Sequence, residues 1–512
     1  MFKGGAIGAI IVTQRQAATG TVTVLIRQAF VFFLAVVTAG CALNDQGDRE
    51  VSAVLLRQEQ TRLDQAALYA AGSSTKQAAT ASTATQAAPP AMEPTVLRDY
   101  IALALAENPD LKAARQTAYA RAKRLPQVTA LPDPMIATRT YSPNRPMMLP
   151  DGNNVFAMSV TQQLPNPEKL DRAGRIALEE TRMALAELEQ ARLRVIADVK
   201  RAYFHLYTIG KSIEITRTNQ ELLRGIIDVV RSQVEAGKRT QDEVLRIQVE
   251  YSDLDRELID LRQQQTSATA TLNTLLNRRP DHPIRMPEEF DVPSADVTLD
   301  ALLAQAGKAN PELKKLEYQI ERDRQSRRLA LLGYWPEFRI GAEWMVMEPR
   351  HDPEADRPNQ GTAGGQGKTT KPMSETARDM YAIMAEMSLP VWAQKIDAAV
   401  KEAEYNLGAS IDQYTAAKNM VAFRVQDALS QVRAQRELVI ILRDTIIPQA
   451  KQAYELSRTS YTTGTSDFLT FVTNWQNWLK FTIQYHRALG ELERTIADLE
   501  QEVGVSMAET QR

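Results

Sequence analysis

Few residues in this 512-residue chain have the types and spacing that catalysis needs. The single cysteine, Cys41, excludes a disulfide framework and any zinc or iron–sulfur site built on cysteines. None of the four histidines lies at metal-ligand spacing such as HExxH: His205, His282, His351 and His486. The sequence has no Gly-rich phosphate loop in a strand–helix context and no nucleophile elbow. It therefore predicts neither an enzyme nor a resident cofactor.

Three carboxylates have a more informative placement, because they follow two glycine turns between long helical stretches. Asp242 and Glu243 come shortly after Gly237, and Asp467 comes shortly after Gly464. Each acid begins a returning helix, so several copies of the chain around one axis would bring these acids together. A ring of carboxylates constricts a pore and favours cations. The alternative is that acids in the first turn of a helix only complement the helix dipole.

Methionine is the other residue type whose placement suggests chemistry. Ten of the sixteen methionines fall in two predicted strand–loop–strand regions, and four of them share one predicted face: Met345, Met347, Met380 and Met384. Thioethers suit Cu(I), and the same logic extends to Ag(I). A lumen lined with exchangeable thioethers would pass a soft ion, since conduction requires weak binding at several sites. The alternative is that methionine is a flexible filler of walls and contacts.

The elements that position these residues begin after a targeting segment. Residues 29–39, AFVFFLAVVTA, are too few to span a bilayer, which needs about 20 residues, but they suit the apolar region of a signal peptide. Small residues precede Cys41, as in a bacterial lipobox, so we expect residues 1–40 to be removed and Cys41 to be lipidated. The alternative is an ordinary signal peptide cleaved nearby. Residues 41–96, rich in Ala, Thr, Gln and Ser, predict a tether or wrapping arm.

The overall charge bears on the kind of partner. The chain has 61 Lys and Arg against 63 Asp and Glu, a formal net charge of -2. Proteins that bind nucleic acid usually carry a basic excess, so we expect no nucleic-acid partner. Apolar residues make up 44% of the chain, which is enough for a sizeable core.

The rest of the chain is a tandem duplication. Asn108-Pro109 matches Asn310-Pro311, and Leu164-Pro165 matches Leu389-Pro390. We therefore predict one repeat over 97–280, a second over 297–503, and a tail at 504–512. The second copy is longer because of residues 348–372, whose glycines and prolines predict an exposed loop.

Each copy predicts the same order of elements: a short helix, two strands, a very long helix and a medium helix. Helices are expected at 97–124, 167–236, 241–277, 297–332, 394–462 and 465–503, and strands at 134–142, 154–163, 337–347 and 379–389. The long helices carry heptad seams of mostly apolar residues, the first at eleven positions from Leu178 to Ile213, and these seams predict coiled-coil-like packing. The second seam is expected to include Ile411, Val421, Val425 and Val432, and Pro448 is expected to bend the helix that contains it.

The strands of the second copy alternate well enough to assign faces. Phe338, Ile340 and Trp344 point one way, whereas Arg339 and Glu343 point the other. This is the pattern of a membrane barrel, apolar outward and more polar inward, although a half-buried soluble sheet would show it too. Four strands cannot close a barrel, for which about eight are the minimum. Closure would require oligomerisation, and three chains would supply twelve strands.

The sequence resembles the TolC outer-membrane efflux family over residues 97–503. The resemblance rests on the paired "NP(D/E)LK" helices, the paired Leu-Pro after the second strand of each copy, and "AGKRTQDEVLRIQVEYSDLDREL". The most specific segment is "YTTGTSDFLTFVTNWQNWLKFTIQYHRALGELERTIADLEQEVG". These segments are most similar to the outer-membrane components of heavy-metal resistance-nodulation-division (RND) systems. The resemblance implies an α+β membrane protein, mostly α, whose homotrimer forms a 12-stranded β-barrel and a long α-helical periplasmic tunnel.

The resemblance also implies partners and site residues. The partners would be a periplasmic adaptor, an inner-membrane RND pump and the lipid of the outer membrane. The glycine turns would form the periplasmic tip, where the adaptor docks on Gly237, Lys238, Arg239 and Gly464; Lys238 and Arg239 are otherwise ordinary solvated turn residues. Glu243 and Asp467 match the positions of acidic gate residues in the family, and Thr470 stands where some members carry a second acid.

The function expected from this sequence is therefore an outer-membrane export channel that extends into the periplasm and is lipid-anchored. One alternative is an outer channel for type I secretion or for organic drug efflux. An alternative from another class is a non-channel coiled-coil lipoprotein with a structural role. The strand pairs at matching positions of both copies argue against the last, since a pure coiled coil has no use for them.

Overall fold

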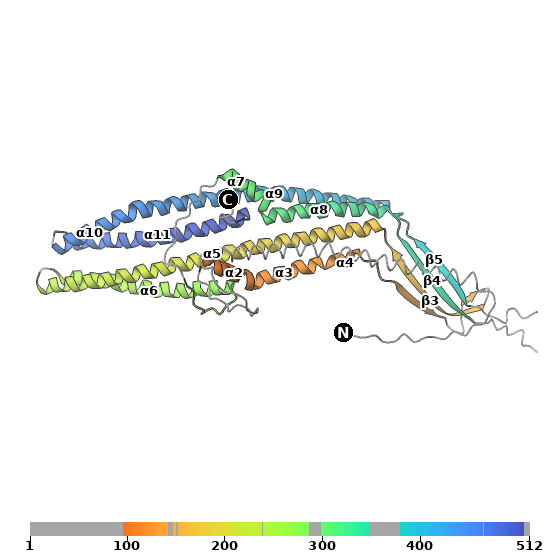
Figure 1. The fold of residues 1–512 in the computed structure, drawn as a ribbon, viewed down its shortest axis with the longest axis horizontal. Coiled ribbons are helices and arrows are strands. Elements are labelled where there is room, and N and C mark those ends of the chain that lie inside the picture. Colours follow the sequence, from red (N-terminus) through yellow and green to blue (C-terminus); the bar gives the residue numbers. More distant parts are fainter. Residues whose placement is uncertain are drawn as a thin grey trace, which may run out of the picture. The chain divides into compact units, whose positions relative to one another are not determined.

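The structure of the protein is a computed structural model that describes residues 96–141, 147–149, 152–237, 239–285, 298–348, 379–463 and 465–505. The predicted signal peptide, nearly all of the predicted arm and of the loop at 348–372, and most of the tail lie outside the described residues, as do Cys41, Lys238 and Gly464. The chain divides into two compact units. One contains a β-sheet and the other contains most of the helices (Figure 1).

The first unit contains an antiparallel sheet of five strands. Four of them lie in the order β1 (Met135–Thr140), β3 (Gly152–Leu164), β4 (Phe338–Glu348) and β5 (Met380–Met387). The short strand β2 (Met147–Leu149) pairs with the start of β3 and was not predicted, whereas the other four strands were. β3 from the first repeat pairs directly with β4 from the second, from Leu164 opposite Phe338 onward. The two repeats thus share one sheet.

The strand register confirms the predicted alternation and extends it across the sheet. Directly opposed residues of antiparallel strands share a face. Trp344 lies opposite Met158 and Tyr381, and Met345 lies opposite Ala157 and Met380. We call the side that holds Trp344 the apolar face, because from Phe338 to Val346 and on the neighbouring strands it carries no charged residue. We call the other side the polar face, and it holds the charged residues Arg139, Arg339, Glu343 and Glu386.

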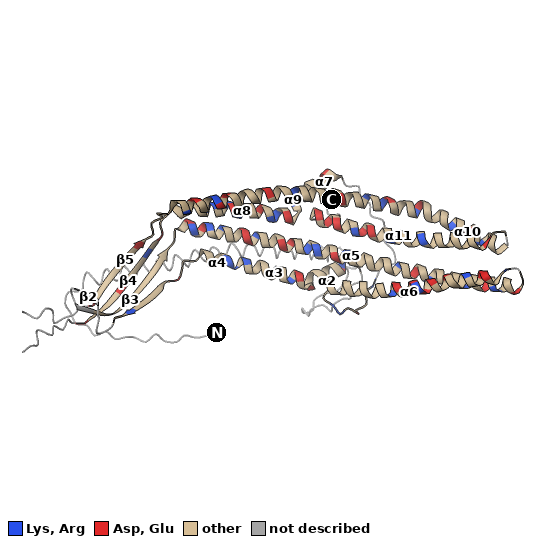
Figure 2. Cartoon of the chain, turned by 180° about the vertical axis from the view of Figure 1, so that it is seen from behind, with Lys and Arg blue, Asp and Glu red and all other residues tan. Residues whose placement is uncertain are grey.

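The second unit is a set of long helices. They are α2 (Leu97–Glu107), α3 (Pro109–Ala122), α5 (Pro167–Glu235, in this unit from Arg175), α6 (Gln241–Leu275), α7 (Leu299–Ala309), α8 (Pro311–Leu331), α9 (Ala393–Ile441), α10 (Ile447–Thr463) and α11 (Phe468–Val503). A one-and-a-half-turn helix, α4 (Arg124–Thr129), belongs to the first unit. Charged residues are spread along the helices, whereas the strands are mostly uncharged (Figure 2). In the described part of the chain, no helix is both long and apolar enough to cross a membrane.

Asparagine breaks the first helix of each repeat, where a continuous helix was predicted. The side-chain oxygen of Asn108 accepts from the amides of Asp110 and Leu111, so this residue caps α3 before Pro109. Its Nδ2 donates to the carbonyl of Leu275 at the end of α6, at 3.0 Å. Asn310 does the same in the second repeat: it caps α8, and its Nδ2 donates to the carbonyl of Glu502 at 2.7 Å. Each asparagine therefore ties a helix junction to the end of the returning helix of its own repeat.

The predicted seams form the cores of the helical unit. On α5, seven of the eleven seam positions are buried and none is exposed. On α9, Val421, Val425 and Val432 are buried as predicted, but Ile411 is 46% exposed. The reason is that the neighbouring residue Ser410 faces α8, where Asp323 and Gln319 bond to its hydroxyl. One residue of helical rotation then turns Ile411 away from the contact.

The predicted interruption near Pro448 takes the form of a π-helical segment. Residues Leu442–Ile446 form π-helix between α9 and α10. Proline has no amide hydrogen and its ring clashes with the carbonyl four residues earlier, so the regular hydrogen-bond ladder cannot continue through Pro448.

Candidate functional site

The turns at the ends of the two helical hairpins hold the predicted carboxylates. Gly237 ends α5 with a φ of 68°, the left-handed conformation that glycine adopts without strain. Gln241 starts α6 four residues later, and Asp467 is the N-cap of α11. A shared apolar cluster joins the α5–α6 hairpin to the α10–α11 hairpin, and Phe471 and Trp475 lie at its centre.

The side chain of Glu243 connects the α5–α6 hairpin to the α10–α11 hairpin. The hydroxyl of Tyr461 on α10 donates to Oε2 of Glu243 at 2.7 Å, and the guanidinium of Arg239 lies 3.7 Å from Oε1. Arg239 also donates to the carbonyl oxygen of Tyr461 at 2.7 Å, and its guanidinium carbon lies 4.3 Å from the centre of the tyrosine ring. The side chains of Arg239 and Glu243 are only 15% and 17% exposed. We call these three residues, Arg239, Glu243 and Tyr461, the tip latch.

Aromatic packing fixes the tyrosine of the tip latch. The ring of Tyr461 stacks on Phe471 at 5.2 Å between centroids, and it packs at a tilt against Phe468. Burial, followed by the hydrogen bond to Glu243, raises the pKa of the Tyr461 hydroxyl above its ordinary value. The hydroxyl therefore remains a hydrogen-bond donor throughout the physiological range. One layer further along, Trp475 donates to Asn219 of α5 at 3.0 Å in a buried contact, which holds the same two hairpins together.

Asp467 has a different environment from Glu243. Its carboxylate accepts from the backbone amide of Thr470 at 3.3 Å and from the Thr470 hydroxyl at 2.5 Å. These bonds, the hydroxyl first, lower the pKa of Asp467, so this fully exposed carboxylate stays ionised well into the acidic range. Thr470 thus stabilises the negative charge of Asp467.

Asp242 is also exposed and pairs with Arg246 one turn later, at 2.9 Å. An exposed pair of this kind contributes little to stability, about 0.3–0.5 kcal/mol. Of the three predicted acids, the structure brings Glu243 together with Arg239, and it leaves Asp242 and Asp467 open to solvent. Their role in a gate stays a prediction.

Sequence reasoning missed Tyr461, which contributes the hydroxyl of the tip latch. The only local signal is its place three residues before Gly464 in "YTTGT". Tyr461 and Glu243 are 218 residues apart in the chain, so their contact depends on how the two hairpins dock.

The four methionines singled out in the sequence lie on the polar face of the sheet. Met345 and Met380 are opposed in the register, and Met384 is opposed to Gly341. Met347 lies opposite Asn154 and is 6% exposed. The structure thus gathers these residues on the side of the sheet where the sequence expected them.

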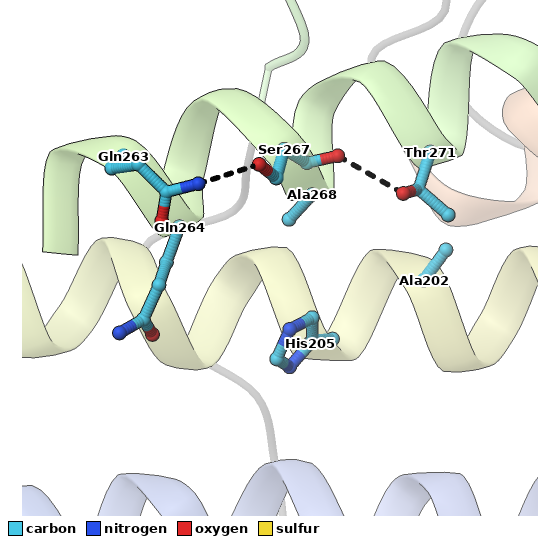
Figure 3. A pocket seen from close by; sticks show the side chains of 7 residues that line it. All are labelled: Ala202, His205, Gln263, Gln264, Ser267, Ala268 and Thr271. Carbon is cyan, nitrogen blue, oxygen red and sulfur yellow. Dashed lines mark hydrogen bonds between the residues drawn. The ribbon is translucent and has the colours of Figure 1, made fainter. Parts of the chain in front are cut away.

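A cavity of about 210 Å³ lies between α5 and α6 (Figure 3). Apart from Ala202 and His205 it is lined by α6 residues, and three of the polar ones bond along their own helix: Gln263 donates to Ser267, and Thr271 donates to the Ser267 carbonyl (Figure 3). Burial and then Arg494 lower the pKa of His205. The cavity offers one neutral imidazole without a carboxylate in its lining, so the tip latch is the better-defined site.

Comparison with known proteins identifies the class. The family model described as "Outer membrane efflux protein" matches residues 100–278 and 302–505, two segments that overlap the two predicted repeats. The chain belongs to this family, and the resemblance to TolC-like channels is confirmed. The family consists of channel proteins of the outer membrane, so the predicted efflux function and outer-membrane location are confirmed, and the structural coiled-coil lipoprotein is rejected.

Solved structures share the fold at low sequence identity. The outer-membrane channel OprN is 17% identical with a TM-score of 0.64, over 80% of this chain and 89% of that chain. VceC from Vibrio cholerae is 16% identical with a TM-score of 0.64, over 80% and 96%. CusC is 12% identical with a TM-score of 0.64, over 80% and 92%. No curated protein sequence matches the chain.

Proposed function

We propose that three copies of the chain form one channel, in which their sheets close into a 12-stranded β-barrel across the outer membrane and their helices form a periplasmic tunnel. The observation that carries this proposal is the apolar face of the sheet. Tyr381 and Ile383 on β5 are 65% and 78% exposed, and Ile136 on β1 is 70% exposed. In water such a surface would be unfavourable, whereas against lipid it is stabilised.

Aromatic residues support the same orientation. Trp344 and Tyr381 are opposed near one end of the pairing between β4 and β5, and Phe338 and the exposed Trp335 lie at or just before its other end on β4. Phe338 and Trp344 are six residues apart, or about 20 Å of strand. Outer-membrane barrels carry an apolar band about 25 Å tall between two aromatic girdles.

Closure by several chains is supported by the strand order. Among the described strands, β1 and β5 are the edges of the sheet, and each presents one row of backbone groups without a strand partner. Pairing β5 of one chain with β1 of the next would satisfy both edges. Four long strands per chain and three chains give twelve, which exceeds the minimum of about eight for closure.

A cysteine scan of these two edges tests the proposal. Thr138→Cys on β1 is combined in turn with Tyr381→Cys, Ile383→Cys and Ala385→Cys on β5, all on the apolar face. We expect one of these pairs to cross-link into covalent trimers in native membranes. Thr138→Cys with Ala342→Cys is the control, because β4 already has partners on both sides. Cross-links that stop at dimers, or that form equally in the control, would contradict the closed trimer.

We further propose that the turns at the hairpin ends form the periplasmic tip, where Asp242, Glu243 and Asp467 gate the channel and a periplasmic adaptor docks, with an inner-membrane pump behind it. The tip latch supports a gate, because it joins the two hairpins that would have to separate for the tip to widen. Arg239 is engaged in the latch, so docking at this turn would depend on Gly237, Lys238 and Gly464 more than on Arg239. Pull-down of purified adaptors from the same genome tests this docking, and binding that is unaffected by inserting residues into the two turns would refute it.

The cargo is not fixed by the fold. Channels for organic drugs, for type I secretion and for metal ions would all be built in this way, so the substrate must be argued from the residues that line the sheet.

A further inference from the structure

The methionines of the sheet favour its polar face. Seven methionines in the strands have described side chains, and five of them lie on the polar face: Met135, Met345, Met347, Met380 and Met384. Only Met158 and Met387 lie on the apolar face. A methionine that merely filled the wall would gain most on the apolar face, where the surroundings are apolar. The observed preference is the opposite, so filling of the wall does not explain where these methionines lie.

Two of these thioethers lie side by side. Met345 on β4 and Met380 on β5 are directly opposed, which puts their Cβ atoms about 4.5–5.5 Å apart. Both side chains are partly buried, and Met347, two residues on along the same face, is buried. Two long, flexible thioether side chains at this separation can place both sulfurs on one ion.

A third thioether lies further along β5 on the same face. Met384 is opposed to Gly341, and its terminal methyl group lies 3.4 Å from the position that a Cβ of residue 341 would occupy. The Met384 side chain therefore lies over β4 at this row, although the group that the glycine makes room for is Thr161, whose Cγ2 would lie 2.8 Å from such a Cβ. Met384 is four residues from Met380, or about 13 Å along the strand. Thioethers thus recur along the face at intervals that an ion could cross in steps.

The surrounding charge favours a soft ion over a hard one. Glu343 lies on the polar face between these two rows, and it interacts with Arg139, which lies in the row of Met345. The positive charge of Arg139 acts on this acid, and the other polar groups of these rows, the thioether sulfurs and the hydroxyls of Ser159 and Thr161, are neutral. In the described residues no group of three or more His, Cys, Asp or Glu could hold a metal ion. Neutral thioethers select soft monovalent ions, whereas hard divalent ions require oxygen ligands.

We propose that Met345 and Met380, with Met384 beyond them, form a transit site for a soft monovalent metal ion of the Cu(I) or Ag(I) class on the polar face of the sheet. This inference rests on the proposed function, in which the polar face lines the lumen, and it names the substrate class of that channel. Only two thioethers meet at the pair, so binding is weak enough for the ion to leave, as conduction requires.

Silver binding to the purified full-length protein tests the site directly. Ag(I) is titrated in chloride-free buffer while the methionine methyl resonances are followed by NMR after ¹³C labelling. We expect the wild-type protein to bind, and Met345→Leu/Met380→Leu to weaken binding at least tenfold. Met158→Leu/Met387→Leu is the matched control, because it removes two methionines from the apolar face of the same sheet, and it should bind as the wild type does. Equal binding by the two double variants, or no binding by the wild type, would overturn the proposal.

Conductance of the same preparations separates this proposal from the proposed function. A wild-type protein that conducts but does not bind silver refutes the thioether site and leaves the channel standing. A protein that does not conduct even when Tyr461→Phe loosens the tip latch refutes the channel, whatever it binds. In cells, the variant Met345→Leu/Met380→Leu should lower tolerance to silver and copper while tolerance to an organic dye stays at the wild-type level. An equal loss for all three would mean that the variant damages the channel as a whole, which contradicts a metal-selective site.

Discussion

Removing one hydroxyl from the tip latch gives the sharpest test of the gate. Tyr461→Phe keeps the ring that stacks on Phe471 and faces Arg239, but it removes the donor that binds Glu243 at 2.7 Å. We therefore expect the two hairpins to keep their core and to separate more readily at the tip. The substitution changes one interaction and leaves the surrounding packing in place.

The size of the effect follows from the kind of hydrogen bond that is lost. A hydrogen bond to a charged group contributes about 1.5–3 kcal/mol. At about 1.4 kcal/mol for each factor of ten, loss of the bond shifts the balance between latched and open tips roughly 10- to 100-fold in each chain. The ion pair between Arg239 and Glu243 and the contact of Arg239 with the aromatic ring remain, so the tip is loosened and not dismantled.

The assay is the open probability of the reconstituted channel in a planar bilayer, read beside the amount of trimer in native membranes. Tyr454→Phe is the matched control. Tyr454 is a buried tyrosine of the same helix that stacks on Trp478, and in the described residues its hydroxyl donates to no carboxylate. We expect more frequent opening in Tyr461→Phe and wild-type behaviour in Tyr454→Phe. An unchanged open probability in Tyr461→Phe, or the same change in both variants, would refute the latch as a gate element.

Three other predictions concern the exposed acid, the anchor and a buried acid. Asp467→Ala, alone or with Glu243→Ala, should raise conductance and weaken block by divalent cations, since a charged ring focuses cations at a constriction; unchanged block in both variants would leave Asp467 as a helix cap only. Cys41→Ser should abolish labelling by a radioactive fatty acid, and a wild-type protein that takes up no label would exclude lipidation. Burial raises the pKa of Glu493 to about 7, so the free energy of unfolding should fall by up to about 3 kcal/mol as pH rises from about 4.5 to 7. Glu493→Gln should remove this pH dependence in a thermal unfolding series, and parallel pH profiles of variant and wild type would contradict this.

The sequence predicted the elements because their signals are local. Alternation along β4 and β5 and the heptad seam of α5 depend on residues a few positions apart, and the structure confirms both. The breaks at Asn108 and Asn310 are also local, since an asparagine before a proline is an N-cap signal, but helical periodicity on both sides concealed them. The position of Ile411 was wrong because seam and helix differ in period, and packing on α8 decided which residue turns inward.

The candidate site was predicted only in part, because it depends on contacts that sequence patterns do not contain. The turn glycines and the acids that follow them were evident from spacing. That Glu243 is held by Tyr461 and Arg239 while Asp467 stays exposed depends on how two hairpins dock. Two acids that look equivalent in the sequence therefore have different environments, one compensated by a cation and a phenol, the other by a threonine.

The two predicted repeats differ in which of their contacts are internal and which are shared. The asparagine clamps are the same in both repeats: Asn108 and Asn310 each bind the end of the returning helix of their own repeat. The tip latch is instead shared, because Arg239 and Glu243 come from the first repeat and Tyr461 from the second. A contact made within a repeat stabilises that repeat alone, whereas a contact between repeats sets how the two hairpins lie against each other. Substitutions in the clamps should therefore lower stability without changing the open probability. Substitutions in the tip latch should change the open probability without lowering stability.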